Sequence, residues 1–177
     1  TLRKVSEIYD SIGFVGVGKY NEFDQLRIAG VRHADLKGYS FSREDVDARW
    51  LANQYAQILG QYFTHEMRPL EVELLVAEMS PEGGGDRLFH LLYDGTVMDT
   101  TSYVVIGGEA EAIGVRLDEN WSVGLQLREA VQVSVGALAG PDRELAPDDL
   151  EVAVLARDGE RRAFRRIEGD DLGGLLG

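Results

Sequence analysis

The sequence predicts an α+β protein in which two sheets pack face to face and helices cover them on the outside. Three observations favour this fold class: the apolar period alternates between two and about 3.6 residues, the helical segments come in pairs, and hairpin signals separate the pairs. Such an order is typical of layered sandwiches, because each sheet and helix must bury one apolar face. With 177 residues, 44% of them hydrophobic, we expect a single domain spanning 1–177.

The first part of the chain carries signals for a hairpin and a helix. Val5 to Val17 is mostly apolar around Asp10-Ser11, which predicts two short strands joined by a turn. Tyr20 to Leu36 has apolar residues about one helical turn apart, and Gly38 is a suitable residue to end that helix. Gly30 lies inside it and weakens it by about 1 kcal/mol relative to alanine.

A second helix is predicted from Ser42 onward. Ser42 and Asp45 form an N-cap signature, with Asp in the place of the usual Glu. The residues that follow place one apolar face on the helix with a period near 3.6. This face consists of Leu51, Tyr55, Ile58, Leu59, Tyr62 and Phe63.

After Pro69 the apolar period changes to two. Val72, Leu74 and Val76 alternate with glutamates, as expected of a half-buried strand. Further strands are expected at 87–93, 96–99 and 103–106, after a glycine-rich loop at 82–85 and with a hairpin turn at Asp94-Gly95.

The last third predicts two more helices and a hairpin. The helices are expected at 109–118 and 122–138, with Ser122 as the N-cap of the second. A polar loop at 139–149 leads to strands at 150–155 and 163–167, which the turn at Asp158-Gly159 joins.

Composition limits the classes of partner. The formal net charge of −13 and the pI near 4.6 describe a surface that repels phosphate backbones, so no nucleic-acid partner is expected. No segment approaches the roughly 20 apolar residues of a membrane span, so no membrane partner is expected either. The absence of cysteine excludes disulfides and thiolate metal sites and fits a cytoplasmic location.

Two short patterns suggest catalysis or nucleotide binding but fit poorly. Gly13-x4-Gly18-Lys19 is close to a phosphate-binding loop, yet Tyr20 stands where a Ser or Thr should hold magnesium, so close strand packing is the better interpretation. Thr1 could be an N-terminal nucleophile, but Leu2-Arg3-Lys4 follows it without strand alternation.

The remaining ionisable residues indicate no catalytic or metal centre. His33, His65 and His90 are scattered, and the zinc-helix motif that begins at His65-Glu66 fails because its second histidine would fall at Pro69. The arginines at 161–162 and 165–166 form the one dense basic cluster. Salt bridging to neighbouring acids, within the chain or across a subunit contact, is the favoured interpretation, and nucleic-acid binding is the minor alternative. A partly sheltered Lys4 could hold a partner's C-terminal carboxylate, although an ordinary solvated lysine is the simpler reading.

In several stretches the chain resembles the α subunits of the proteasome core particle in their actinobacterial form. The matching stretches occur in order along the chain: Leu2-x-Lys4-Val5-Ser6-Glu7-Ile8-Tyr9-Asp10, Gly18-Lys19-Tyr20-Asn21-Glu22-Phe23-Asp24-x-Leu26-Arg27, Leu51-Ala52-Asn53-x-Tyr55-Ala56-Gln57, Glu71-Val72-Glu73-Leu74, Tyr93-Asp94-Gly95, Leu150-Glu151-Val152-Ala153-Val154-Leu155 and Arg161-Arg162-Ala163-Phe164-Arg165-Arg166-Ile167.

The resemblance implies the four-layer αββα sandwich of the N-terminal-nucleophile hydrolases, without the N-terminal helix and first strands that would precede Thr1. It implies a non-catalytic subunit with no catalytic residue, cofactor or metal. Its partners would be other α subunits in a homo-heptameric outer ring that controls substrate entry, the β subunits, and the C-terminal tails of a ring-shaped proteasomal ATPase or other activator. Lys4 matches the family's activator-tail lysine, and tagged proteins would be the substrates.

One alternative stays open at this point. A catalytically active threonine protease of the same superfamily, of β type or forming a single ring, would need a free N-terminal Thr1 with a lysine and an acid behind it. The gate residues of the family, and the other basic residue of the activator pocket, would lie upstream of Thr1, so neither is assigned to this sequence.

Overall fold

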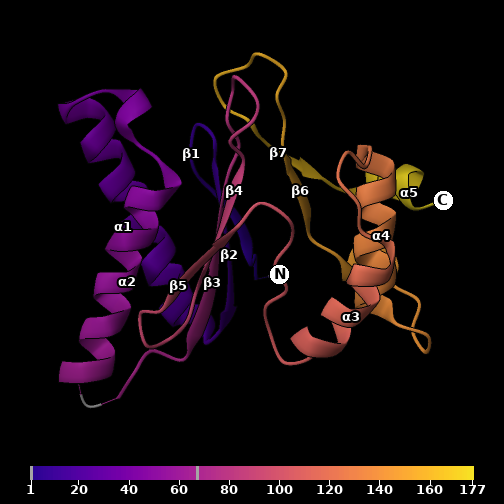
Figure 1. Ribbon diagram of the computed structural model, residues 1–177, viewed down its shortest axis with the longest axis horizontal. Helices are drawn as coiled ribbons and strands as arrows, with labels where there is room; N and C mark the ends of the chain where they lie inside the picture. The colour runs from indigo at the N-terminus through magenta and orange to yellow at the C-terminus, as the bar shows by residue number, and fades with distance from the viewer. Residues whose placement is uncertain (1, 67) are drawn as a thin grey trace. The chain divides into compact units, whose positions relative to one another are not determined.

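The computed structural model describes residues 2–66 and 68–177, which form two compact units (Figure 1). The first unit comprises Thr1–Val104 and Val154–Arg165, and the second comprises Val105–Ala153 and Arg166–Gly177. The mixture of helices and antiparallel strands confirms the α+β class. The expectation of one domain over the whole chain stays a prediction.

The first unit is built on a five-stranded antiparallel sheet whose strands follow one another in chain order. The strands are β1 (Val5–Tyr9), β2 (Ile12–Gly18), β3 (Val72–Glu78), β4 (Arg87–Leu91) and β5 (Val97–Thr100). The predicted hairpin of β1 and β2 is confirmed, as is the turn at Asp94-Gly95, where Gly95 has φ of 91°. β1 and β5 are the edge strands.

Two helices, α1 (Tyr20–Ser40) and α2 (Ala48–His65), cover one face of this sheet (Figure 1). The predicted alternation of β3 is confirmed, because Leu74 and Val76 are fully buried and pair with Leu91 and Phe89 of β4. These side chains belong to the same buried cluster as the apolar faces of the helices. The helix residues of this core include Phe23, Leu26, Leu51, Tyr55 and Leu59.

Gly38 does not end α1, which continues to Ser40. A Cβ built on Gly38 would lie 2.0 Å from the hydroxyl oxygen of Tyr9. The glycine therefore serves close packing against β1 within the helix, and the expectation that it terminates the helix is wrong. The backbone N–H of Phe41 then bonds to the carbonyl of Lys37 at the C-cap.

The N-cap of α2 also differs from the prediction. Ser42 caps a short 3₁₀ helix, η1 (Arg43–Asp45), and Asp47 caps α2 by accepting a 2.8 Å hydrogen bond from the N–H of Trp50. The predicted apolar face is confirmed for Leu51, Tyr55 and Leu59. Tyr62 and Phe63 in the last two turns are exposed.

The predicted strand at 103–106 is wrong, because no strand ladder of the described chain includes it. A β-branched apolar run is compatible with a strand, but a strand also needs a neighbour to bond its N–H and C=O groups. The sheet ends at β5, and the segment 103–106 is partly buried without joining a ladder.

The second unit is mainly helical. It contains α3 (Ala110–Asn120), α4 (Leu127–Ala139), the 3₁₀ helix η2 (Pro147–Asp149) and α5 (Gly169–Leu176). The helix predicted at 109–118 is confirmed, whereas Ser122 is not a cap, because a turn at 123–124 separates it from α4, whose N-cap is Gln126. The unpredicted α5 is joined to α4 by Gln132, whose amide donates to the carbonyl of Leu175 at 3.0 Å.

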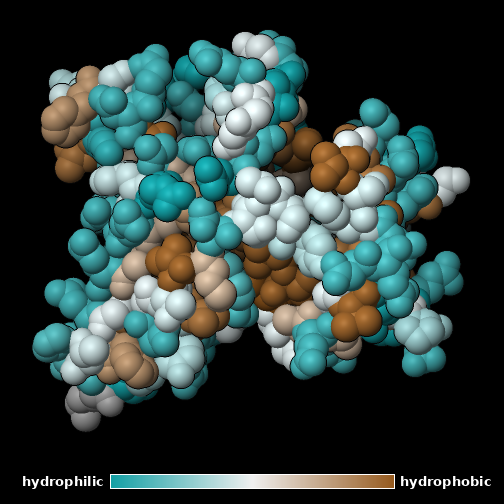
Figure 2. Space-filling model, viewed as in Figure 1, coloured by the Kyte–Doolittle hydropathy of each residue, from teal (hydrophilic) through white to brown (hydrophobic). Residues whose placement is uncertain are grey.

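β6 (Val152–Leu155) and β7 (Phe164–Ile167) form a separate two-stranded sheet, which confirms the last predicted hairpin. Hydrophilic side chains predominate on the face of the molecule in Figure 2, as expected from the net charge of −13. No helix in the described part of the chain is long and apolar enough to cross a membrane.

Candidate protein-binding surface

Lys4 lies directly before the edge strand β1. Its carbonyl accepts a 3.1 Å hydrogen bond from the N–H of Gly16 in β2, so the pairing of the hairpin extends to this residue. The Lys4 side chain is exposed. The sheet therefore fixes the backbone that carries this exposed side chain.

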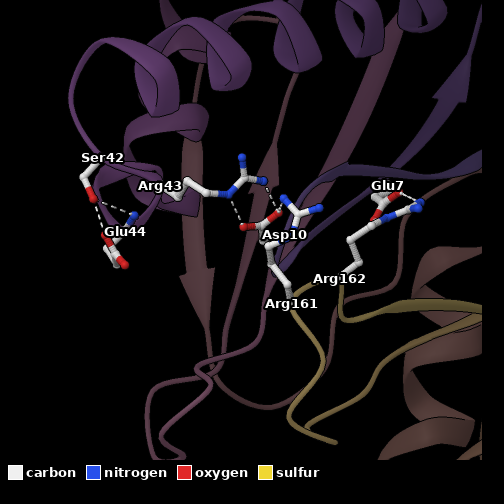
Figure 3. Close-up of polar contacts among 7 residues, drawn as sticks. All are labelled: Glu7, Asp10, Ser42, Arg43, Glu44, Arg161 and Arg162. Atoms are coloured by element: carbon white, nitrogen blue, oxygen red, sulfur yellow. Dashed lines mark hydrogen bonds and ion pairs between the residues drawn. The ribbon is translucent and has the colours of Figure 1, made fainter.

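A polar cluster continues along β1 and into its turn (Figure 3). Glu7, in the middle of the strand, accepts two hydrogen bonds from Arg162, of 2.6 and 3.2 Å. Because both nitrogens of the guanidinium fork contact both oxygens of one carboxylate, this pair fixes residue 162 against β1 in a defined orientation.

Asp10 lies between two arginines. Arg43 donates to its two carboxylate oxygens at 2.5 and 2.8 Å, and the guanidinium of Arg161 lies 3.8 Å from one of them (Figure 3). Hydrogen bonding to the Asp10 carboxylate raises the pKa of Arg43 above its ordinary value. The Asp10 carbonyl also accepts from the N–H of Ala163 at 2.8 Å, so η1 and the segment before β7 both converge on this turn.

A groove of about 710 Å³ lies beside this cluster. Its lining includes Asp10, Arg43 and Arg161, together with Asp47, Glu78 and Glu82. Two of the acids have structural partners: Asp47 caps α2, and Glu78 accepts a 2.8 Å hydrogen bond from the N–H of Ala48. The groove therefore has paired charges on its walls beside apolar side chains such as Val46 and Met79.

The phosphate-loop interpretation of Gly13 to Lys19 is wrong. The glycines lie within β2, which pairs with β1 and β3 along its length. A Cβ on Gly16 would lie 2.6 Å from the ring of Phe23, and one on Gly18 would lie 2.1 Å from the carbonyl oxygen of Glu71. Close packing accounts for both glycines, and Lys19 is paired with Glu71 at 3.1 Å.

The three histidines are separate, and His65 and His90 have ordinary partners. His90 contacts Glu73 at 2.8 Å, and the ring of His65 contacts the hydroxyl of Thr64. Across residues 2–66 and 68–177 no group of His, Asp and Glu could hold a metal ion. Thr1 lies outside the described residues, so the nucleophile interpretation is not tested by the structure.

The predicted salt bridging of the four clustered arginines is confirmed. Arg161 and Arg162 pair with Asp10 and Glu7, Arg165 pairs with Asp158 at 3.2 Å, and Arg166 pairs with Glu151 at 3.9 Å. Sequence reasoning missed the role of Arg43, because its partner Asp10 is 33 residues away and carried only a turn signal. Lys4 is outside the groove lining, so its predicted role depends on the resemblance.

Comparison with known proteins places the chain in a family. Residues 1–155 match the family described as "Proteasome subunit". The chain is 56% identical over 177 residues to the proteasome subunit alpha of Acidimicrobium ferrooxidans, covering all of this chain and 76% of that protein. It is 53% identical to the subunits of the same name from Kineococcus radiotolerans and Sanguibacter keddieii, covering 99% of this chain and 78% and 71% of those proteins.

The chain therefore belongs to the proteasome subunit family. The relatives described here share the name proteasome subunit alpha, so the similarity is to the alpha type, as the sequence resemblance indicated. Membership in this family implies assembly with other proteasome subunits in protein degradation.

Proposed function

We propose that the chain is a non-catalytic α subunit that forms the outer heptameric ring of a proteasome core particle. The observation that carries this proposal is the 56% identity, over the full length of the chain, to a protein named proteasome subunit alpha. The ring would stack on β subunits, which supply the catalytic threonines, and would control the entry of tagged substrates. The four-layer αββα arrangement of the family is part of the same proposal.

The ring would also dock the C-terminal tails of a ring-shaped ATPase at Lys4. The exposed position of Lys4, directly before β1, supports this assignment, because a lysine can pair with a terminal carboxylate. A single pair of this kind is weak in water, but several tails that bind one ring gain affinity through effective concentration.

Assembly tests the structural role. Native mass spectrometry and electron microscopy of the chain with a β subunit should show rings stacked as a barrel. A mechanism-based threonine-protease inhibitor should label the β subunit and leave this chain unlabelled. Acylation of any hydroxyl of this chain would instead favour the active threonine protease.

A lysine exchange tests the docking site. Lys4→Ala should weaken the ATPase-stimulated degradation of a folded substrate and leave ring assembly and peptide hydrolysis unchanged. Lys19→Ala is the matched control, because it removes the same charge at another exposed lysine, directly after β2. Equal binding of an activator-tail peptide by wild type and Lys4→Ala rings would remove Lys4 from the mechanism.

A further inference from the structure

A pocket of about 300 Å³ in the first unit has an arginine-rich lining. Glu160, Arg161, Arg162, Phe164 and Arg165 line it, so three guanidinium groups stand against one carboxylate. A small concave site of this composition suits a carboxylate ligand, because the guanidinium fork matches the two oxygens of a carboxylate group.

The chain itself holds two of these three arginines. Arg162 forms its two-point contact with Glu7, and Arg165 donates to the carbonyl of Phe164 at 3.0 Å while it pairs with Asp158 at 3.2 Å. Arg162 and Arg165 are therefore held in the wall of the pocket with their charges already paired.

Arg161 differs from its neighbours. Its ion pair with Asp10 is 3.8 Å long, which is beyond hydrogen-bond distance, and Arg43 already holds both oxygens of Asp10. Its side chain is 62% exposed and makes no hydrogen bond to any residue in 2–66 and 68–177. A guanidinium group has five N–H donors, so Arg161 can receive a carboxylate from outside the chain.

The second unit of the chain carries an excess of such carboxylates. Within Val105–Ala153 and Arg166–Gly177, 13 Asp and Glu stand against 4 Lys and Arg, a formal charge of −9. The first unit holds 18 Asp and Glu against 14 Lys and Arg, a charge of −4 over a longer sequence. Every additional copy of the chain therefore brings a second unit of net negative charge, opposite in sign to the arginines of the pocket.

We propose that the Arg161 pocket of one copy binds a carboxylate of the second unit of a neighbouring copy. This proposal rests on the ring of α subunits proposed above. It identifies a contact between neighbouring subunits that would fix their orientation in that ring. A closed ring requires a heterologous interface, in which two different surfaces of the same chain meet. An arginine pocket on one unit and a net negative charge on the other meet this requirement, and the charge pair would set the direction in which copies add.

A charge-reversal series tests the contact in the full chain. Arg161→Glu should raise the dissociation constant between copies by about tenfold or more, because it places a carboxylate against an acidic surface. The matched control is Arg32→Glu, which makes the same charge change at an exposed arginine of α1. Native mass spectrometry over a range of protein and salt concentrations measures the dissociation constants of both variants. Rising salt should weaken the association of the wild-type chain.

Chemical crosslinking identifies the partner directly. In Arg161→Lys, a carbodiimide should join the new amine to a carboxylate that lies within ion-pair distance. Mixing isotopically light and heavy copies separates links between copies from links within one copy. We expect light-to-heavy links from position 161 to peptides of 105–153 or 166–177.

The outcomes separate this proposal from the proposed function. Wild-type chain that fails to assemble with β subunits would overturn the ring and this contact with it. Rings that form equally well in Arg161→Glu and Arg32→Glu would overturn the contact alone. Links from position 161 that reach only Asp10 or Glu160 of the same copy, or only a β subunit, would also overturn it.

Discussion

The hydroxyl of Tyr55 on α2 donates a 2.9 Å hydrogen bond to the backbone carbonyl of Leu26 on α1. Gly30, one turn after Leu26, makes this contact possible, because a Cβ at that position would lie 1.9 Å from the Tyr55 oxygen. The Tyr55 side chain is buried, and burial raises its pKa, so the hydroxyl remains a donor over the physiological range. The glycine that weakens α1 by propensity thus allows the two helices to pack closely.

This relationship predicts that changes at the two positions are coupled. Tyr55→Phe should lower the free energy of unfolding by about 1 kcal/mol through loss of the hydrogen bond. Gly30→Ala should lower it by about 1–3 kcal/mol, because the new methyl group displaces the tyrosine ring. Denaturant titration should show the double variant less destabilised than the sum of the single variants, and simple additivity would contradict direct contact.

Glycines inside the helices of the second unit should behave in the opposite way. A Cβ on Gly114 of α3 or Gly136 of α4 meets nothing within 4 Å. Alanine at either position should therefore raise the free energy of unfolding by up to about 1 kcal/mol, through helix propensity and a less flexible unfolded chain. The control is Gly140→Ala, which should destabilise because Gly140 has φ of 68°. A loss of stability in Gly114→Ala, measured by thermal unfolding, would contradict this reasoning.

Local signals in the sequence predicted most of the elements. The β1–β2 hairpin, the alternation of β3 and the turn at Gly95 depend on neighbouring residues, which are visible in the sequence. The misplaced boundaries depended on tertiary contacts. Gly38 lies inside a helix because Tyr9 packs against it, and the segment 103–106 lacks a ladder although its residues favour one.

Less of the candidate site could be predicted from neighbouring residues in the sequence. Composition and spacing left Lys4 as an ordinary lysine, and only the resemblance gave it a role. The pairing of Asp10 with Arg43 joins residues far apart in sequence, with no pattern that links them. The salt bridging of Arg161 and Arg162 could be anticipated from the local charge density, although their partners on β1 and its turn could not.

Glu22 predicts a defined loss of stability in acid. Its side chain is buried, contacts Arg68 and accepts a 2.7 Å hydrogen bond from the N–H of Glu71. Burial alone would raise the pKa of Glu22, but these hydrogen bonds and the charges of Arg68 and Lys19 together lower it. The carboxylate therefore stabilises the fold above its unfolded pKa of about 4.5, and this contribution is lost as pH falls through the lower folded value.

Glu22→Gln should accordingly be less stable than wild type at pH 7, and the difference should shrink as the pH falls below about 4.5. Urea titrations at several pH values measure it. Glu82→Gln is the control, because Glu82 is exposed in the loop between β3 and β4 and should show little difference at any pH. If Glu22→Gln is less stable than wild type by the same amount down to pH 3, the substitution acts through packing and the charge of Glu22 makes no contribution.

Glu78 predicts the opposite pH dependence. Burial raises its pKa, and the hydrogen bond from the Ala48 N–H only partly offsets this effect. The folded state therefore binds a proton more readily than the unfolded chain, so the charge of Glu78 disfavours folding above its folded pKa and has no such effect below about 4.5.

Glu78→Gln keeps a carbonyl that can accept from Ala48 and removes the buried charge. It should be at least as stable as wild type at pH 7, and that advantage should disappear as the pH falls below about 4.5. Glu78→Ala separates charge from hydrogen bonding, because it also leaves the first N–H of α2 without this acceptor and should be about 1 kcal/mol less stable than Glu78→Gln at every pH. If Glu78→Gln loses as much stability at pH 7 as Glu78→Ala does, the carboxylate charge stabilises α2. That result would contradict a raised pKa of Glu78 in the folded state.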